Sequence, residues 1–235
     1  MRLLFALLLA LLPLPALADV TARYAAGKDV VTVEVADSGN WRVDYPGSFS
    51  IIRRDGVDYI ALLFGPAPKV ARLDEVMAAT GAGRGAEPPV PPMLRDMKLT
   101  VTANGEAVIA GRKALLWNLV PVVPSEAASP KDILEVAVSA DPELAPVGAV
   151  FRHVAEVLLP LFGPLLPESG FAERVRELLA KGTPLRAGKK FELQSLDSAI
   201  IDPKRFDLPA PPVSAAEFMG ESGMSVTGTD IAPLP

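Results

Sequence analysis

The sequence contains no cysteine and only one histidine among its 235 residues. Without cysteine the chain cannot form a disulfide, a thiolate metal site, a cysteine nucleophile or a lipid-modified N-terminal cysteine. The single histidine, His153, cannot build a multi-histidine metal centre. The formal net charge of −5 also lacks the basic excess that is typical of nucleic-acid-binding proteins. We therefore expect no metal, no other cofactor and no nucleic-acid partner.

Long apolar runs are missing except at the N-terminus. Residues 1–18 combine Arg2, an apolar run over residues 3–12 and a small-x-small motif that ends at Ala18, which is the pattern of a cleaved signal peptide. That run is shorter than the roughly 20 residues needed to cross a bilayer. The most apolar later stretch, residues 154–167, is short and interrupted by proline and glycine. We expect cleavage after Ala18, no membrane span in the mature chain, and a periplasmic or secreted protein.

Proline, in contrast, is abundant, with 24 residues, which is about twice ordinary usage. It gathers in a glycine- and proline-rich stretch at residues 81–92 and in the last segment, residues 209–235. Neither stretch shows the periodicity of a helix or strand, so we predict a long loop at 81–92 and a disordered tail at 209–235. Residues 19–208 then form a single domain.

Alternating and doubly apolar segments predict about nine or ten β-strands. Residues 31–35 and 41–45 alternate between apolar and polar side chains, as half-buried strands do. Asp55-Gly56 and Asn104-Gly105 are expected hairpin turns. Residues 59–64 are apolar on both faces, which is typical of a central strand that is covered on both sides.

Two amphipathic helices are expected late in the chain, at residues 141–160 and about 168–181. The first has apolar residues at helical spacing. These are Val147, Val150, Phe151, Val154, Val157, Leu158 and Leu161. An antiparallel sheet of this size tends to curl or split. The predicted fold is therefore α+β, a curled antiparallel sheet that forms a half-open β-barrel covered by the two helices.

Several stretches resemble a known family. Residues 41–45, Trp-Arg-Val-Asp-Tyr, and residues 51–60, with their Asp-Gly hairpin, resemble the early meander of the periplasmic lipoprotein carrier LolA and its relatives. Residues 111–114, 138–142 and 182–186 are similar to an uncharacterised bacterial family, a domain of unknown function assigned to the same carrier-like fold. The resemblance implies a half-open barrel with a helical lid. It also implies a role in shuttling or sensing lipid or lipoprotein.

A ligand site is expected where the apolar side chains of the sheet and of the helices face one another. Incomplete packing there would leave a hydrophobic cavity. The residues that we predict to line it are Trp41, Tyr45, Trp117, Val150, Phe151, Val154 and Leu158. A fully packed core without a cavity is the alternative, and the sequence does not separate the two.

The sequence shows no catalytic or metal-binding constellation, so we expect a protein that is not an enzyme. His153 lies one helical turn from Glu156 but without a nucleophile motif, and we interpret it as a histidine on the helix flank. Several acids lie at turns or strand ends without the spacing of a metal-binding loop, and we interpret them as solvated. They are Asp55, Asp58, Asp202 and Asp207.

Two functions follow from these patterns. The first is binding of a lipid, an acyl chain or a lipoprotein between the sheet and the helices. The second is an envelope protein-interaction module with a solid core, which contacts its partner through the proline-rich loop and the C-terminal tail. Neither the identity of the ligand nor the oligomeric state follows from the sequence.

Overall fold

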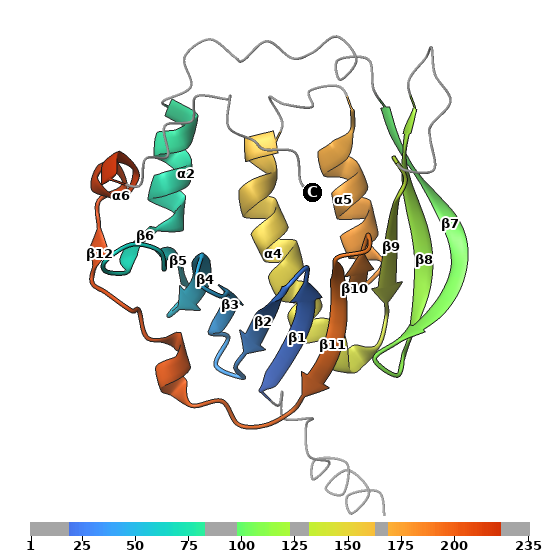
Figure 1. Cartoon of the computed structure of the whole chain (residues 1–235), viewed down its shortest axis with the longest axis horizontal. Helices are drawn as coiled ribbons and strands as arrows, with labels where there is room; N and C mark the ends of the chain where they lie inside the picture. The colour runs from blue at the N-terminus through green and yellow to red at the C-terminus, as the bar shows by residue number, and fades with distance from the viewer. Residues whose placement is uncertain (1–18, 83–97, 123–131, 163–168, 222–235) are drawn as a thin grey trace, which may run out of the picture.

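The structure, a computed structural model, describes residues 19–82, 98–122, 132–162 and 169–221 (Figure 1). It is an α+β protein with a large, mostly antiparallel sheet and few helices. The predicted signal peptide lies outside the described residues. Of the predicted loop at 81–92, residues 81 and 82 belong to a helix, contrary to our prediction, and the rest lies outside the described residues. In chain order the elements are β1 (Val20–Ala26), β2 (Asp29–Val35), β3 (Trp41–Tyr45), β4 (Phe49–Arg54), β5 (Val57–Leu62), β6 (Lys69–Arg72), α2 (Leu73–Ala82), β7 (Lys98–Ile109), β8 (Arg112–Val122), β9 (Leu134–Ser139), η1 (Pro142–Leu144), α4 (Ala145–Phe162), α5 (Phe171–Ala180), β10 (Thr183–Ala187), β11 (Phe191–Asp197), η2 (Pro203–Phe206), β12 (Pro212–Val213) and α6 (Ala215–Glu221).

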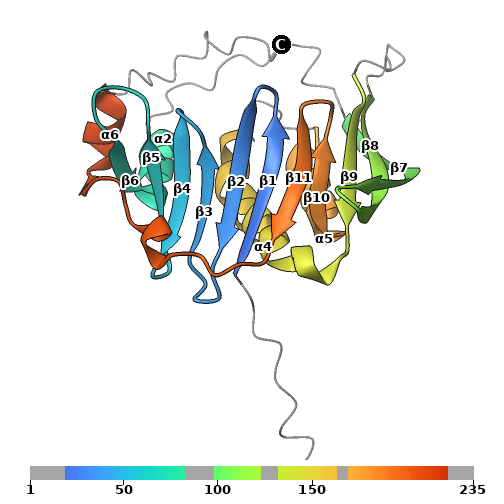
Figure 2. The same cartoon turned by 60° about the horizontal axis from the view of Figure 1, so that its bottom comes forward.

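The sheet has twelve strands in the order β12-β6-β5-β4-β3-β2-β1-β11-β10-β9-β8-β7. Every pair is antiparallel except β12 with β6, which is parallel. The sheet is neither closed nor strongly curled, so the predicted half-open barrel is not seen. Helices α2, α4 and α5 cover one face, and part of the C-terminal segment covers the other (Figures 1 and 2). The helices and the C-terminal segment thus bury apolar side chains of the sheet. In a curled sheet the same side chains would be buried against other strands.

The Asn-Gly dipeptide lies inside a strand, contrary to our prediction of a turn. β7 continues through Asn104 and Gly105, and its pairing with β8 shifts there by one residue, as in a β-bulge. The hairpin turn lies at Ala110 and Gly111, whose φ angles are 49° and 76°. Gly105 has a φ of 105°. A bulge and a type I′ turn both require positive φ, so the same dipeptide suits either.

The two late helices form close to the predicted positions. Asp141 caps the 3₁₀ turn η1 by accepting a hydrogen bond from the backbone N–H of Glu143. α4 then runs through Pro160, where we expected it to end. Pro160 has no backbone N–H, so the hydrogen bond to the carbonyl of Glu156 is missing, and the helix continues for only two more residues. None of the helices in the described ranges has both the length and the apolar character needed to cross a membrane.

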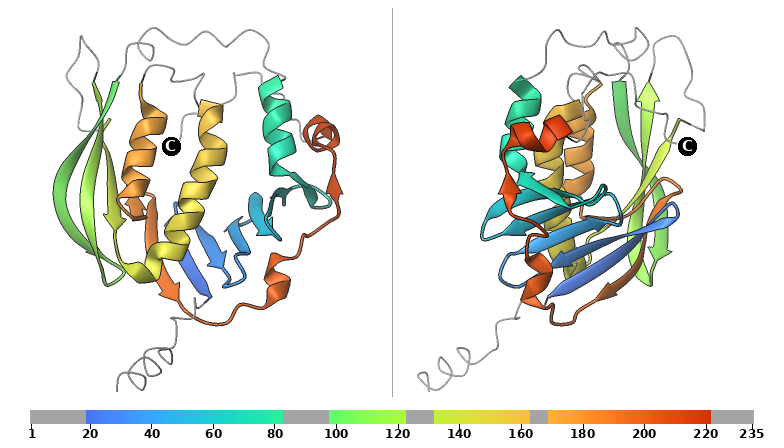
Figure 3. Two further views of the ribbon diagram at one scale, coloured as in Figure 1. Left: turned by 180° about the vertical axis from the view of Figure 1, so that it is seen from behind. Right: turned by 60° about the vertical axis from the view of Figure 1, so that its left-hand side comes forward.

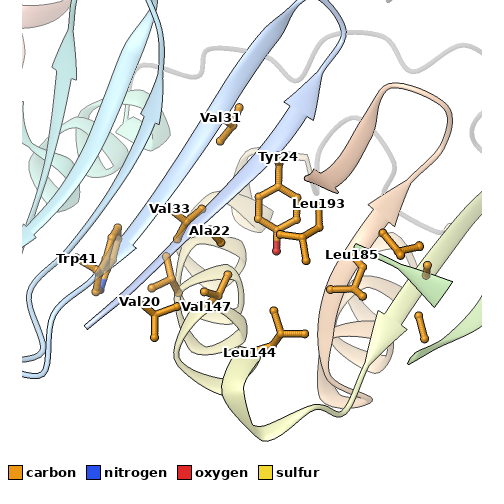
Figure 4. Close-up of a cluster of buried hydrophobic side chains, with 14 of the residues drawn as sticks. Val20, Ala22, Tyr24, Val31, Val33, Trp41, Leu144, Val147, Leu185 and Leu193 are labelled. Carbon is orange, nitrogen blue, oxygen red and sulfur yellow. The ribbon is translucent and has the colours of Figure 1, made fainter. Parts of the chain in front are cut away.

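The main core lies between the centre of the sheet and α4 (Figure 4). Tyr24 of β1 is fully buried there, stacked on Phe191 at 4.7 Å between ring centroids and edge-on to Phe151 at 5.5 Å. Its hydroxyl donates to the backbone oxygen of Pro184 at 3.1 Å. Burial raises the pKa of the Tyr24 phenol above its ordinary value. This aromatic cluster joins β1, β11 and α4 into one solid unit.

The C-terminal strap, residues 198–221, is ordered and integral to the fold. We predicted disorder from residue 209 onward, but β12 extends the sheet at β6 and α6 packs against α2. Phe218 of α6 is fully buried, in a cluster with Leu62, Ala71 and Val76. The disorder prediction is therefore wrong for residues 209–221, and the rest of that segment lies outside the described residues.

The strap also crosses the face of the sheet opposite the helices (Figure 2). Arg205 donates to the carboxylate of Glu34 at 2.8 Å and to that of Asp44 at 3.2 Å. The hydrogen bond to Glu34 raises the pKa of the Arg205 guanidinium. Leu208 packs in a cluster with Ile52, Ala61 and Val70. The strap thus covers the second face of β5, as the two-sided apolar pattern at residues 59–64 predicted.

Candidate functional site

The seven predicted lining residues do not meet in one place. Six of them belong to the main core or pack against it, and Trp117 packs in a separate cluster beside α5. Trp41 is 5% exposed and Val150 is 2% exposed. The side chains of these two residues are buried in the core. The half-buried members are Tyr45, Trp117, Phe151, Val154 and Leu158.

Burial changes along α4. Leu144, just before the helix, and Val147 are fully buried, and Val150 is nearly so. Beyond them, Val154 and its neighbours toward β3–β5 are only half-buried although they pack against the same core. The N-terminal half of the helix is therefore packed closely on the sheet. In the next two turns Val154, Val157 and Leu158 are only half-buried, whereas Leu159 is buried.

Half-buried apolar side chains of β3, β4, β5 and α2 pack against the same core as this part of α4. We call the group the apolar strip, and its members are Val43, Tyr45, Phe49, Ile60, Met77, Val154, Val157 and Leu158. The rings of Tyr45 and Phe49 stack at 5.7 Å between centroids. Figures 1 and 3 show that α2 and α4 stand apart over this region of the sheet. The strip contains three of the predicted residues and is apolar throughout.

A polar cluster lies beside Trp41 on the same face of the sheet. His153 Nε2 is 2.6 Å from Asp58 Oδ2 and 3.0 Å from Arg53 Nη1, and Arg53 also contacts Asp58 at 3.3 Å. The two contacts of Nε2 exclude one another as hydrogen bonds, because a protonated Nε2 donates to Asp58 whereas an unprotonated one accepts from Arg53. The ring of His153 also meets Trp41 edge-on at 5.6 Å. The cluster joins α4 to β4 and β5.

Two interpretations of these residues were wrong. Asp58 is not a solvated turn acid, because its side chain is only 17% exposed and pairs with two partners. His153 is not simply on a helix flank, since it is held by a carboxylate. No local pattern signals either contact, because the partners are separated by 95 and 100 residues. Within the described part of the chain these contacts bring no hydroxyl nucleophile to the ring, so the cluster orients an imidazole without assembling a catalytic triad.

Replacing Asp58 by asparagine is expected to lower the free energy of unfolding by about 1–3 kcal/mol, because the partly buried Arg53 loses its carboxylate. Urea unfolding monitored by circular dichroism measures this change. Asp55→Asn is the matched control, since the Asp55 side chain is 82% exposed and its loss should matter little. If both variants are equally stable, the cluster contributes nothing to the fold.

Two hollows lie outside the apolar strip. One, of about 370 Å³, lies between α4 and α5 and is lined by Arg152, His153, Glu156, Arg176 and Leu179. Arg176 donates to both oxygens of Glu156 there, which lowers the pKa of that carboxyl. The other, of about 460 Å³, lies against β8 and β9 and has Trp117 in its wall. Trp117 is thus the one predicted residue that lines either of these hollows.

Comparison with protein-family models, with curated proteins and with solved structures finds no match. The resemblance to the LolA carriers therefore remains a prediction based on residues 41–60 and the later motifs. Among the described residues no group of three or more histidine, aspartate and glutamate side chains is placed to hold a metal ion.

Proposed function

We propose that the protein binds the apolar part of a hydrophobic ligand, such as a lipid or the acyl chain of a lipoprotein, along the apolar strip. The single observation that supports this is the incomplete burial of eight apolar side chains of β3–β5, α2 and α4 that pack against the same core. Single half-exposed apolar side chains are ordinary on a soluble protein, so the support lies in the number of them that pack against one side of the same core. Covering them with a ligand gains about 25 cal/mol per Å² of apolar surface removed from water.

The elements on which α2 and α4 pack favour this location. α2 packs on β5, β6 and α6, whereas α4 packs on β1, β2, β10 and α5, and the two helices contact each other sparsely. The space between them can therefore widen without breaking the aromatic cluster around Tyr24. Non-catalytic uptake of an acyl chain by a sheet with helices on one face is also what the resemblance to LolA implies. A more curled, half-open form of the sheet belongs to this proposal.

The alternative is an interaction module that works through the proline-rich loop and the C-terminal tail, and its use of the tail has less support. Phe218, at the centre of the part of the tail that the structure describes, is fully buried against α2 and β6. A side chain that is committed to the protein's own core does not contact a partner.

Titration with cis-parinaric acid, a fluorescent fatty acid, tests the proposal. We expect saturable binding that Leu158→Asn weakens about tenfold, because an unpaired amide at a half-buried apolar position costs about 1–3 kcal/mol. Ile200→Asn is the matched control, since Ile200 is 96% exposed and lies outside the strip. Circular dichroism confirms that both variants fold.

Three outcomes count against the proposal. One is the absence of saturable binding by the unaltered protein together with no lipid in its organic-solvent extract. Another is equal weakening by Leu158→Asn and Ile200→Asn. The third is unchanged affinity in a Leu158→Asn variant that is shown to be folded.

A further inference from the structure

The hollow beside Trp117 lies next to the C-terminal end of α5, where Lys181 lines it. Leu178 of α5 packs on Val136, Val138 and Trp117, but the helix stops at Ala180. Leu115 of β8, which pairs directly with Val138 of β9, is nevertheless 50% exposed. The result is a hollow of about 460 Å³ with an apolar floor. Its volume is within the range of small-molecule sites, about 300–1,000 Å³.

Three basic and two acidic side chains line this hollow, Arg112, Lys113 and Lys181 against Glu106 and Asp141. Arg112 is neutralised by Asp141, which it contacts closely, and by Glu143 at 2.8 Å. Lys113 and Lys181 also line the hollow, whereas Glu106 is the remaining acid of the lining. The Nζ of Lys181 lies 4.2 Å from the centroid of the Trp117 ring and 3.5 Å from Glu177.

The carboxylate of Glu177 does not neutralise Lys181 fully, because Arg174 shares it at 2.6 Å. The two cations thus have one acid between them. A ligand that approaches the exposed edge of Lys181 meets a positive charge held over an aromatic ring. The arrangement suits a carboxylate attached to an apolar body.

Trp117 provides a second, independent observation. Its indole N–H is buried and donates to no acceptor in the described part of the chain. A buried unsatisfied donor is rare in native proteins and calls for an explanation. A molecule bound in this hollow can supply a hydrogen-bond acceptor to this N–H after a small movement of the ring.

We propose that this hollow is a second binding site, which takes a small amphipathic carboxylate. The apolar body lies on Leu115, Val138 and the edge of Trp117, and the carboxylate lies between Lys113 and Lys181. No residue of the apolar strip lines this hollow. The site is therefore separate from the one proposed above, and it stands whether or not that proposal holds.

Trp117 itself reports on binding. The chain has two tryptophans, so a Trp41→Phe variant leaves Trp117 as the only tryptophan, which is excited separately from the tyrosines at the long-wavelength edge of its absorption. Titrating this variant with monomeric decanoate should produce a saturable change in Trp117 emission. Decyltrimethylammonium, which has the same chain and the opposite charge, should bind about tenfold more weakly or not at all.

Substitutions in the same background locate the site. Lys181→Met, which keeps the apolar stem, and Lys113→Gln should each weaken decanoate binding about tenfold. Leu115→Asp should abolish the saturable response, since it places an acid on the apolar floor. Lys28→Met is the matched control because Lys28 is exposed in a turn away from the hollow. Leu158→Asn should leave the Trp117 response unchanged, which separates this site from the apolar strip.

Several results would overturn the proposal. They are a response that does not saturate, equal affinity for the cationic amphiphile, and lysine variants that bind like Lys28→Met. A response to phosphatidylglycerol vesicles but not to monomeric decanoate would also overturn it, because the site would then read a membrane surface. Circular dichroism of each variant excludes unfolding as the cause of a lost signal.

Discussion

Gly182→Ala is expected to lower the thermal midpoint by at least ~10 °C or to prevent stable folding altogether. Gly182 connects α5 to β10 with a φ of 147°, and a Cβ at this position would overlap the backbone oxygen of Ser139. That oxygen belongs to β9, which pairs with β10 through Thr183 and Ser139. Because the obstacle is backbone and not a flexible side chain, the clash can be relieved only by separating the two strands.

Gly27→Ala is the matched control for this experiment. Gly27 also has a positive φ, 66°, but no atom lies within 4 Å of the position that a Cβ would take there. Only the local cost of a left-handed residue applies, about 1–2 kcal/mol. Thermal melts followed by circular dichroism compare the two variants. If Gly182→Ala unfolds at the same temperature as Gly27→Ala, the close approach of β9 and the α5–β10 connection is wrong.

Phe218→Ala is expected to destabilise the protein by about 3–5 kcal/mol, the usual cost of deleting a fully buried phenylalanine. Phe218 is 0% exposed and fills the space between α2, β5 and β6. Its loss should release α6 and with it the parallel pairing of β12 with β6. Urea unfolding gives the free energy, and limited proteolysis shows whether residues 212–221 become accessible.

Glu217→Ala supplies the control for Phe218→Ala, because Glu217 is an exposed neighbour on the same short helix. Its substitution should change stability by no more than about 0.5 kcal/mol. Equal stability of the two variants, with protease cleavage already seen in the unaltered protein, would restore the disordered tail that the sequence predicts.

The sheet could be predicted from the sequence wherever its pattern is local. Residues 31–35 and 41–45 form strands because alternating side chains fit a half-buried pleated surface. Asp55-Gly56 forms the expected hairpin, since both residues take positive φ. The stripe of α4 is also where the spacing placed it, because helical periodicity alone decides which side chains share a face.

The site was predicted only in part. The alternation of apolar and polar residues shows on which face of a strand a side chain lies, but it does not show what packs over that face. Trp41 and Tyr45 both point to the helix-covered side of β3, as alternation requires. Whether a side chain there is sealed, as Trp41 is, or half-open, as Tyr45 is, depends on where α4 and α2 lie above it. His153, Asp58 and Arg53 were missed for the same reason, because their contact spans three separate elements.

By itself the sequence determined the α+β class, the positions of most strands and the two late helices, because these depend on interactions between residues a few positions apart. Only the tertiary structure decided that Asn104-Gly105 forms a bulge, that the sheet stays open, and that residues 209–221 fold back onto it. Phe218 has no periodic neighbours to mark it as core. It is buried because β6 and α2, which lie far earlier in the chain, leave a space that its ring fills.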